Sequence, residues 1–154
     1  MIWHLLARQR KVKFDNQWLK MALQKLTGVI DLPVKEVAIV FVSDRTITRV
    51  NKMFTGRNSP TDVLSFRTGA SLADLFISVE TAARQAKSYG QTLEEELLYL
   101  VLHGLLHLKG FSDYLPQEYT RMKNMQDKIM LKIKNLLRFQ RPEKGKKNEP
   151  FQKG

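Results

Sequence analysis

The sequence predicts an α+β fold, in which a single mixed β-sheet of about four strands packs with about five helices. Three observations predict it. Strand-like and helix-like patterns interleave along the chain, so the strands can share one sheet with helices packed against it. The length of 154 residues and the 43% hydrophobic content suit one compact core. The segment 92–107 is helical in pattern and apolar nearly all round, which predicts a buried central helix.

The chain is expected to begin with a strand and an amphipathic helix. Residues 2–7 form a short, mostly apolar run interrupted by His4, which is consistent with a first strand. Apolar residues then recur three and four positions apart over residues 15–27. This spacing predicts a helix with one buried face, and Gly28 is expected to end it.

The strongest strand signal lies at residues 34–43. The segment is rich in β-branched residues and follows Pro33, which predicts a largely buried strand. Asp44 is then expected to cap a helix whose apolar residues share one face. Gly56 is expected to end that helix in a left-handed conformation.

Two shorter strands and another helix are expected next. Residues 61–66 alternate well enough to form a short strand after a loop, and residues 75–78 suggest a second one. Residues 80–89 have a helical pattern that Gly90 is expected to terminate. The order of these elements keeps all the strands within reach of one sheet.

Two helices complete the expected fold. Thr92 and Glu95 have the spacing of a capping box, which predicts the start of the central helix. Pro116 suits the first turn of a last long helix, whose apolar stripe continues to Leu137. We expect one domain over residues 1–138 and a basic, flexible tail over residues 139–154.

Composition and charge restrict the class of protein. The chain has no cysteine, so disulfides, thiolate nucleophiles and cysteine metal sites are excluded. No apolar run approaches the roughly 20 residues that span a bilayer, so we expect a cytoplasmic protein without membrane contact. The net charge of +11 favours a polyanionic partner, and nucleic acid is the leading candidate. The basic tail could contact phosphates or could serve only to keep the chain soluble.

A cluster of candidate metal ligands lies at the end of the central helix. His103 and His107 are four residues apart, so a helix places both imidazoles on one face, close enough to bind one ion. Gly110 is the kind of residue that ends a helix in a left-handed turn and returns the chain, which would bring Asp113 toward the pair. Three ligands with an open fourth position are typical of a catalytic metal site. The alternative is two helical histidines that bond to neighbouring carbonyl groups.

The spacing of these ligands can be compared with that of a known protease class. It matches the ligand pattern of the metzincin proteases, so we describe the central helix as metzincin-like. Those proteases carry a glutamate directly after the first histidine as the general base, and that position is Gly104 here. A glycine cannot accept a proton, so the sequence does not favour a protease.

Three separated blocks resemble the YbeY endoribonucleases. The segment 103–113, HGLLHLKGFSD, is similar to the family signature HGxLHLxGxDH. The segments 60–66, PTDVLSF, and 72–78, LADLFIS, resemble two further blocks of the family in the same order and at the same spacing. The resemblance covers most of the chain up to about residue 135.

The sequence departs from the family pattern at three positions. Asp113 stands where the family has its third metal histidine, which keeps a ligand atom but makes it an anionic oxygen. Ser112 replaces an aspartate beside it. Thr55 stands where the family usually has an arginine, and Arg57 lies two residues further along.

The resemblance implies a metal-dependent, single-strand-specific endoribonuclease. Its implied role is maturation of the 3′ end of small-subunit ribosomal RNA and ribosome quality control. The expected partners are precursor ribosomal RNA and the small ribosomal subunit with its proteins, not DNA, and we expect a monomer. The expected cofactor is one zinc ion on His103, His107 and Asp113, with nickel or another divalent transition metal as an alternative.

Three basic residues are candidates for contacting the RNA backbone. Lys52, Arg57 and Arg67 flank the expected strand 61–66, and Arg57 is also the catalytic candidate in place of the family arginine. Asp74 is expected to cap a strand locally or to orient a ligand histidine. Two other classes stay open. One is an RNA- or ribosome-binding assembly factor with a structural metal, and the other is a metzincin-like metal hydrolase that acts on another substrate.

Overall fold

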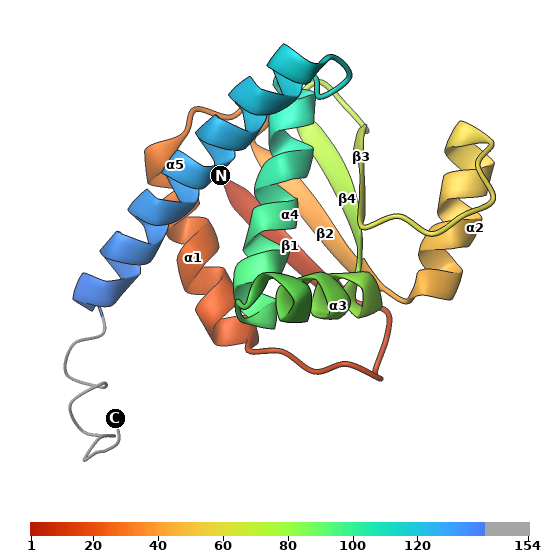
Figure 1. The fold of residues 1–154 in the computed structure, drawn as a ribbon, viewed down its shortest axis with the longest axis horizontal. Coiled ribbons are helices and arrows are strands. Elements are labelled where there is room, and N and C mark those ends of the chain that lie inside the picture. The colour runs from red at the N-terminus through yellow and green to blue at the C-terminus, as the bar shows by residue number, and fades with distance from the viewer. Residues whose placement is uncertain (141–154) are drawn as a thin grey trace.

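The fold is built on one mixed four-stranded sheet (Figure 1). The computed structural model describes residues 1–140. The strand order is β1-β2-β4-β3, in which β1, β2 and β4 run parallel and β3 pairs antiparallel with β4. This confirms the predicted mixed sheet and the α+β class. The strands are β1 (Ile2–Ala7), β2 (Glu36–Val42), β3 (Val63–Arg67) and β4 (Leu72–Ser78).

Five helices pack with this sheet in the described part of the chain, as predicted. The helix α4 crosses one face of the sheet, with α1 and α5 packed beside it, while α2 lies to one side, next to β4 and α3 (Figure 1). Most of the apolar core lies between α4 and the sheet. The helices are α1 (Asn16–Val29), α2 (Asp44–Thr55), α3 (Val79–Tyr89), α4 (Leu93–Leu108) and α5 (Pro116–Gln140).

The helix boundaries correct two of the expectations. Ser43, not Asp44, caps α2, because its hydroxyl oxygen accepts from the Thr46 amide while Asp44 already lies in the first turn. Gly28 does not end α1, which continues to Val29. A glycine inside a helix lowers its stability but does not break it when no positive φ is needed.

The structure does not test the predicted basic tail, and it bears on the membrane only through the described helices. The helix α5 continues to Gln140, and residues 141–154, which make up most of the predicted basic tail, lie outside the described residues. The tail therefore stays a prediction. Within residues 1–140, none of the helices is both long and apolar enough to cross a lipid bilayer.

The central helix has the start and the burial that the sequence predicts. Thr92 and Glu95 form a complete capping box, in which each side chain accepts from the backbone amide of the other residue. The helix ends near Lys109, and Gly110 has a φ of 108°, a conformation that disfavours any residue with a Cβ. The fully buried apolar residues of α4 are Leu97, Leu98, Val101, Leu102, Leu105 and Leu106.

A close contact fixes the distance between α4 and the sheet. A Cβ atom added at Gly104 would lie 2.4 Å from Cδ2 of Leu75 in β4 and 3.5 Å from Cβ of Ser65 in β3. Ser65 and Leu75 are paired across the β3–β4 hairpin, so both side chains lie on the face that α4 covers. A side chain at Gly104 would therefore have to displace the buried side chain of Leu75, and a glutamate would need still more room.

One charged side chain is buried in the same helix. Glu96 is only 2% exposed, and its Oε1 accepts a hydrogen bond from Nε2 of Gln91. Burial raises the pKa of Glu96 from 4.5 to about 7, and the negative charge of Asp62 adds to the rise, while the bond from Gln91 opposes it. The protein thus favours the neutral form of this carboxyl group.

Glu96 should make stability depend on pH. Below about pH 4.5 the carboxyl is protonated in both states, so its full contribution is present. Between pH 4.5 and 7 the unfolded chain ionises first, and the free energy of unfolding falls by up to about 3 kcal/mol. We expect Glu96→Gln to remove this fall, because the amide stays neutral and can still accept from Gln91. Urea denaturation at several pH values would check this, and an equal slope in both proteins would contradict it.

Candidate metal centre

The structure brings the three predicted ligands together at the end of α4. The Nε2 atoms of His103 and His107 are 3.1 Å apart, and Oδ2 of Asp113 lies 3.6 Å from each. Ligand atoms that surround a tetrahedral ion at zinc-like bond lengths lie about 3.4 Å from one another. The three atoms thus have the spacing of three corners of such a site, and together they form a group that could hold a metal ion.

The other ring nitrogens fix the tautomer of both histidines. Nδ1 of His107 lies 3.1 Å from the carbonyl oxygen of Phe111, and Nδ1 of His103 lies 3.3 Å from Oε1 of Gln126. The Phe111 carbonyl oxygen only accepts, so Nδ1 of His107 carries the proton, and Nδ1 of His103 carries one when Gln126 presents its Oε1 to it. The Nε2 lone pairs then point toward one another and toward the Asp113 carboxylate. A cation between them would convert this mutual repulsion into attraction, so the residues present fit a divalent metal.

The orientation of the Gln126 amide leaves its nitrogen without a hydrogen-bond partner among the described residues. The side chain is 2% exposed, and its Nε2 atom has no hydrogen-bond partner in the described part of the chain. An unpaired buried donor costs about 1–3 kcal/mol. Turning the amide would point a donor at Nδ1 of His103, so that His103 could no longer keep a proton there. The orientation that suits metal binding is therefore the one that leaves the amide nitrogen without a partner.

These two supporting contacts were not predicted from the sequence. Asp74 was expected either to cap a strand locally or to orient a ligand histidine, and it lies within β4, paired across the sheet with Phe66 and Ala38. The second alternative was wrong, since Gln126 and a backbone carbonyl occupy both Nδ1 positions. A signal for Gln126 was present, because it is a polar residue beside the apolar stripe of α5.

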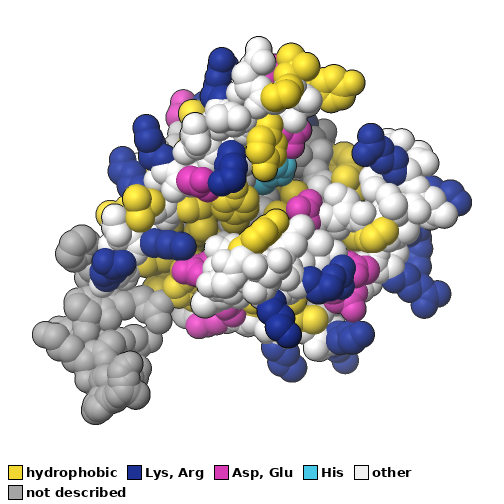
Figure 2. All heavy atoms as spheres, viewed as in Figure 1, with side chains coloured by type: hydrophobic (Ala, Val, Ile, Leu, Met, Phe, Trp, Pro, Cys, Tyr) yellow, Lys and Arg dark blue, Asp and Glu magenta, His cyan; other side chains and the backbone are white. Residues whose placement is uncertain are grey.

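The three basic candidates lie on exposed parts of the surface. Lys52 is on α2, Arg57 follows it in the loop, and Arg67 ends β3, where its Nη1 donates to the Ala70 carbonyl. No hydrogen bond or ion pair within residues 1–140 joins them to the three ligands. Figure 2 shows a histidine side chain in a hollow, with Lys and Arg side chains on the surface over α2 and its loop beside it. Their contact with RNA stays a prediction.

The position of the family arginine has a structural role here. Thr55 ends α2, and its hydroxyl oxygen lies 2.7 Å from both the backbone oxygen and Oδ1 of Asn51, either of which can accept its one hydrogen. Gly56 follows with a φ of 80°. Nδ2 of Asn51 then donates to the Ser59 carbonyl, which fastens the loop that carries Arg57. Arg57 is therefore the first arginine after the end of α2. It lies on a loop that is tied back to the helix by the bond between Asn51 and Ser59.

Gln126→Met should separate metal binding from folding. Methionine has a similar volume and removes both the contact to Nδ1 of His103 and the unpaired amide. We expect metal affinity to fall about 10- to 100-fold, as for other partners of ligand histidines, while the metal-free protein keeps or gains stability. A zinc titration against a chelating dye and urea denaturation measure the two effects. Gln117→Met, at an exposed position of the same helix, is the control. Unchanged zinc affinity in Gln126→Met would contradict the assigned role.

Comparisons with known proteins identify the family and agree with the fold. The family model described as "Endoribonuclease YbeY" matches residues 5–134. A protein named endoribonuclease YbeY from Syntrophus aciditrophicus is 34% identical over 133 residues, which cover 79% of this chain and 83% of that protein. Another of the same name, from Aster yellows witches'-broom phytoplasma, is 39% identical over 114 residues, which cover 66% of this chain and 78% of that protein. The solution structure of TM1509 from Thermotoga maritima superposes with a TM-score of 0.61 and 26% identity, covering 90% of this chain and 93% of the other. The chain belongs to the endoribonuclease YbeY family.

Proposed function

We propose that this protein is a metal-dependent endoribonuclease that cleaves single-stranded RNA. Its proposed role is to mature the 3′ end of small-subunit ribosomal RNA and to act in ribosome quality control, in the cytoplasm. The relatives named endoribonuclease support the reaction class. The observation that carries the metal dependence is the convergence of three ligand atoms, with both histidines held in the tautomer that a metal requires.

The roles of the site residues follow from their chemistry. His103, His107 and Asp113 would hold the ion, and the mixed nitrogen and oxygen set suits zinc first, with nickel as an alternative. A divalent cation bound there supplies a Lewis acid beside the scissile phosphate. Gln126 and the Phe111 carbonyl orient the two imidazoles. Asp113 puts a negative charge where relatives with a third histidine have a neutral ring, so this site is less positive.

The basic residues are proposed to hold the RNA next to the ion. A guanidinium can donate two parallel hydrogen bonds to one phosphate, so Arg57 is assigned to the reacting phosphate group. Lys52 and Arg67 would contact neighbouring phosphates and set the course of the strand. With Gly104 directly after His103, the position that carries the general base in metzincins has no carboxylate here.

RNA cleavage with matched histidine variants tests the proposal. Purified full-length protein is incubated with precursor ribosomal RNA and zinc, with and without a chelator. We expect His103→Ala and His107→Ala to lose at least 100-fold in rate, because each variant loses an ion ligand. His4→Ala is the control, since His4 lies in β1, where its Nε2 pairs with Glu36.

Three outcomes separate the candidate functions. Cleavage that survives both the chelator and the two ligand variants would refute a metal-dependent nuclease. Tight RNA binding without cleavage under any metal would favour the assembly factor. Hydrolysis of peptides or small phosphoesters under conditions that leave RNA intact would favour another hydrolase.

A further inference from the structure

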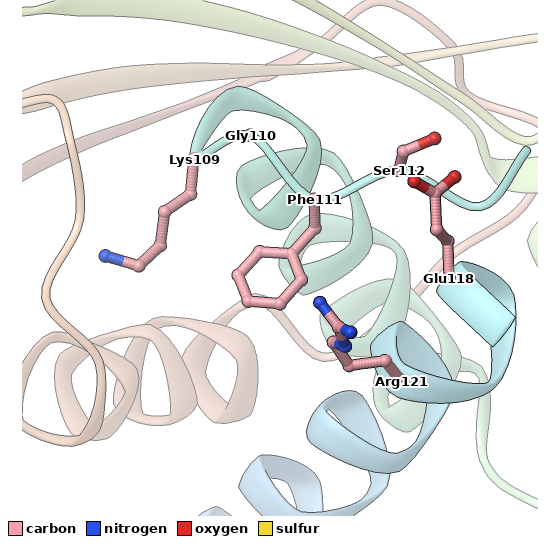
Figure 3. A pocket seen from close by; sticks show the side chains of 6 residues that line it. All are labelled: Lys109, Gly110, Phe111, Ser112, Glu118 and Arg121. Carbon is pink, nitrogen blue, oxygen red and sulfur yellow. The ribbon is translucent and has the colours of Figure 1, made fainter.

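A pocket adjoins the candidate metal centre. It lies between the turn that follows α4 and the first turns of α5, and its volume is about 280 Å³ (Figure 3). Sites for drug-sized ligands start near 300 Å³, so this pocket suits a group of about the size of one nucleotide. It is lined by Lys109, Gly110, Phe111, Ser112, Glu118 and Arg121.

The pocket combines an aromatic ring with two cations. Figure 3 shows the Phe111 ring with the Lys109 side chain on one side and the Arg121 guanidinium on the other. Phe111 is half-buried and packs against the core, so its ring is held in place and loses little freedom on binding. An aromatic surface beside basic side chains is the combination by which proteins bind single-stranded nucleic acid, through base stacking and phosphate contacts.

The charges of the pocket favour an anion. Among the described residues, the Lys109 ammonium donates only to the neutral backbone carbonyl of Asp31. Within residues 1–140, the Arg121 side chain makes no hydrogen bond or ion pair. Glu118 is the one carboxylate of the lining, and its Oε1 accepts from the Leu115 amide at the start of α5. The two cations thus keep their charge available for a ligand.

The pocket is continuous with the metal centre through the backbone. The Phe111 carbonyl accepts from Nδ1 of His107, and Ser112 directly precedes the ligand Asp113. The pocket is therefore the direct neighbour of the metal centre along the chain. Tyr114, in this turn, is 90% exposed, and Tyr119, near the start of α5, is 53% exposed. Figure 2 shows hydrophobic side chains exposed over the turn between α4 and α5, where further bases could stack.

We infer that this pocket binds one nucleotide of the single-stranded RNA substrate, with its base on Phe111 and its phosphate between Lys109 and Arg121. The inference rests on the proposed nuclease function and adds a subsite on the side of the metal centre away from α2. It assigns the RNA a path from the basic surface of α2, across the ion, to the turn between α4 and α5.

Binding measured without catalysis tests this subsite. Full-length protein is titrated with a fluorescent, unstructured RNA oligonucleotide in the presence of chelator, so that nothing is cleaved. We expect Phe111→Leu to weaken binding about tenfold and Phe111→Tyr to keep it, because tyrosine retains the ring. Arg121→Gln should also weaken binding about tenfold and make the slope of log affinity against log salt shallower by about 0.7. Lys128→Gln, at an exposed position further along α5, is the control.

The outcomes distinguish this subsite from the nuclease proposal. If the wild type cleaves RNA but Phe111→Leu and Arg121→Gln both bind it like the control, the subsite is refuted and the nuclease stands. If the wild type fails to cleave with every metal but these variants bind RNA more weakly, the subsite stands and the nuclease fails. Arg121 is exposed, so its variant stays informative even if Phe111→Leu does not fold. If the two variants keep the RNA affinity of the wild type but lose affinity for an acidic peptide, the nucleotide subsite is also refuted. The pocket is then assigned to a protein partner.

Discussion

The contact between α4 and the β3–β4 hairpin is the constraint on which the site depends. Gly104 lets the helix backbone approach Leu75 and Ser65 more closely than any other residue would. This contact lies between the two ligand histidines, so it sets where both imidazoles sit relative to the sheet. It also leaves little room for the glutamate by which metzincins activate water, because a side chain there would have to displace Leu75.

Much of the fold could be predicted because local signals agreed with tertiary packing. The capping box of Thr92 and Glu95, the β-branched run of β2 and the left-handed Gly110 each specify one structure. The errors arose where two local choices have nearly equal energy. Ser43 and Asp44 are both good caps, and Gly28 can end a helix or continue it.

The site was predictable only as far as sequence spacing determines geometry. His103 and His107 share a helix, and Gly110 returns the chain, so three ligand positions followed from a few residues. Gln126 lies on another helix, and its contact with His103 depends on how α5 packs on α4. The Phe111 carbonyl has no side-chain signal at all. Such partners depend on tertiary packing, which spacing along the chain does not reveal.

The most direct test of the central claim is an X-ray absorption spectrum of the protein loaded with one equivalent of zinc. The account predicts two imidazole nitrogens and one carboxylate oxygen from the protein at about 2.0–2.2 Å, with one imidazole missing in His107→Ala. Failure to retain zinc, or a spectrum without imidazole ligands, would contradict the metal centre and the mechanism built on it.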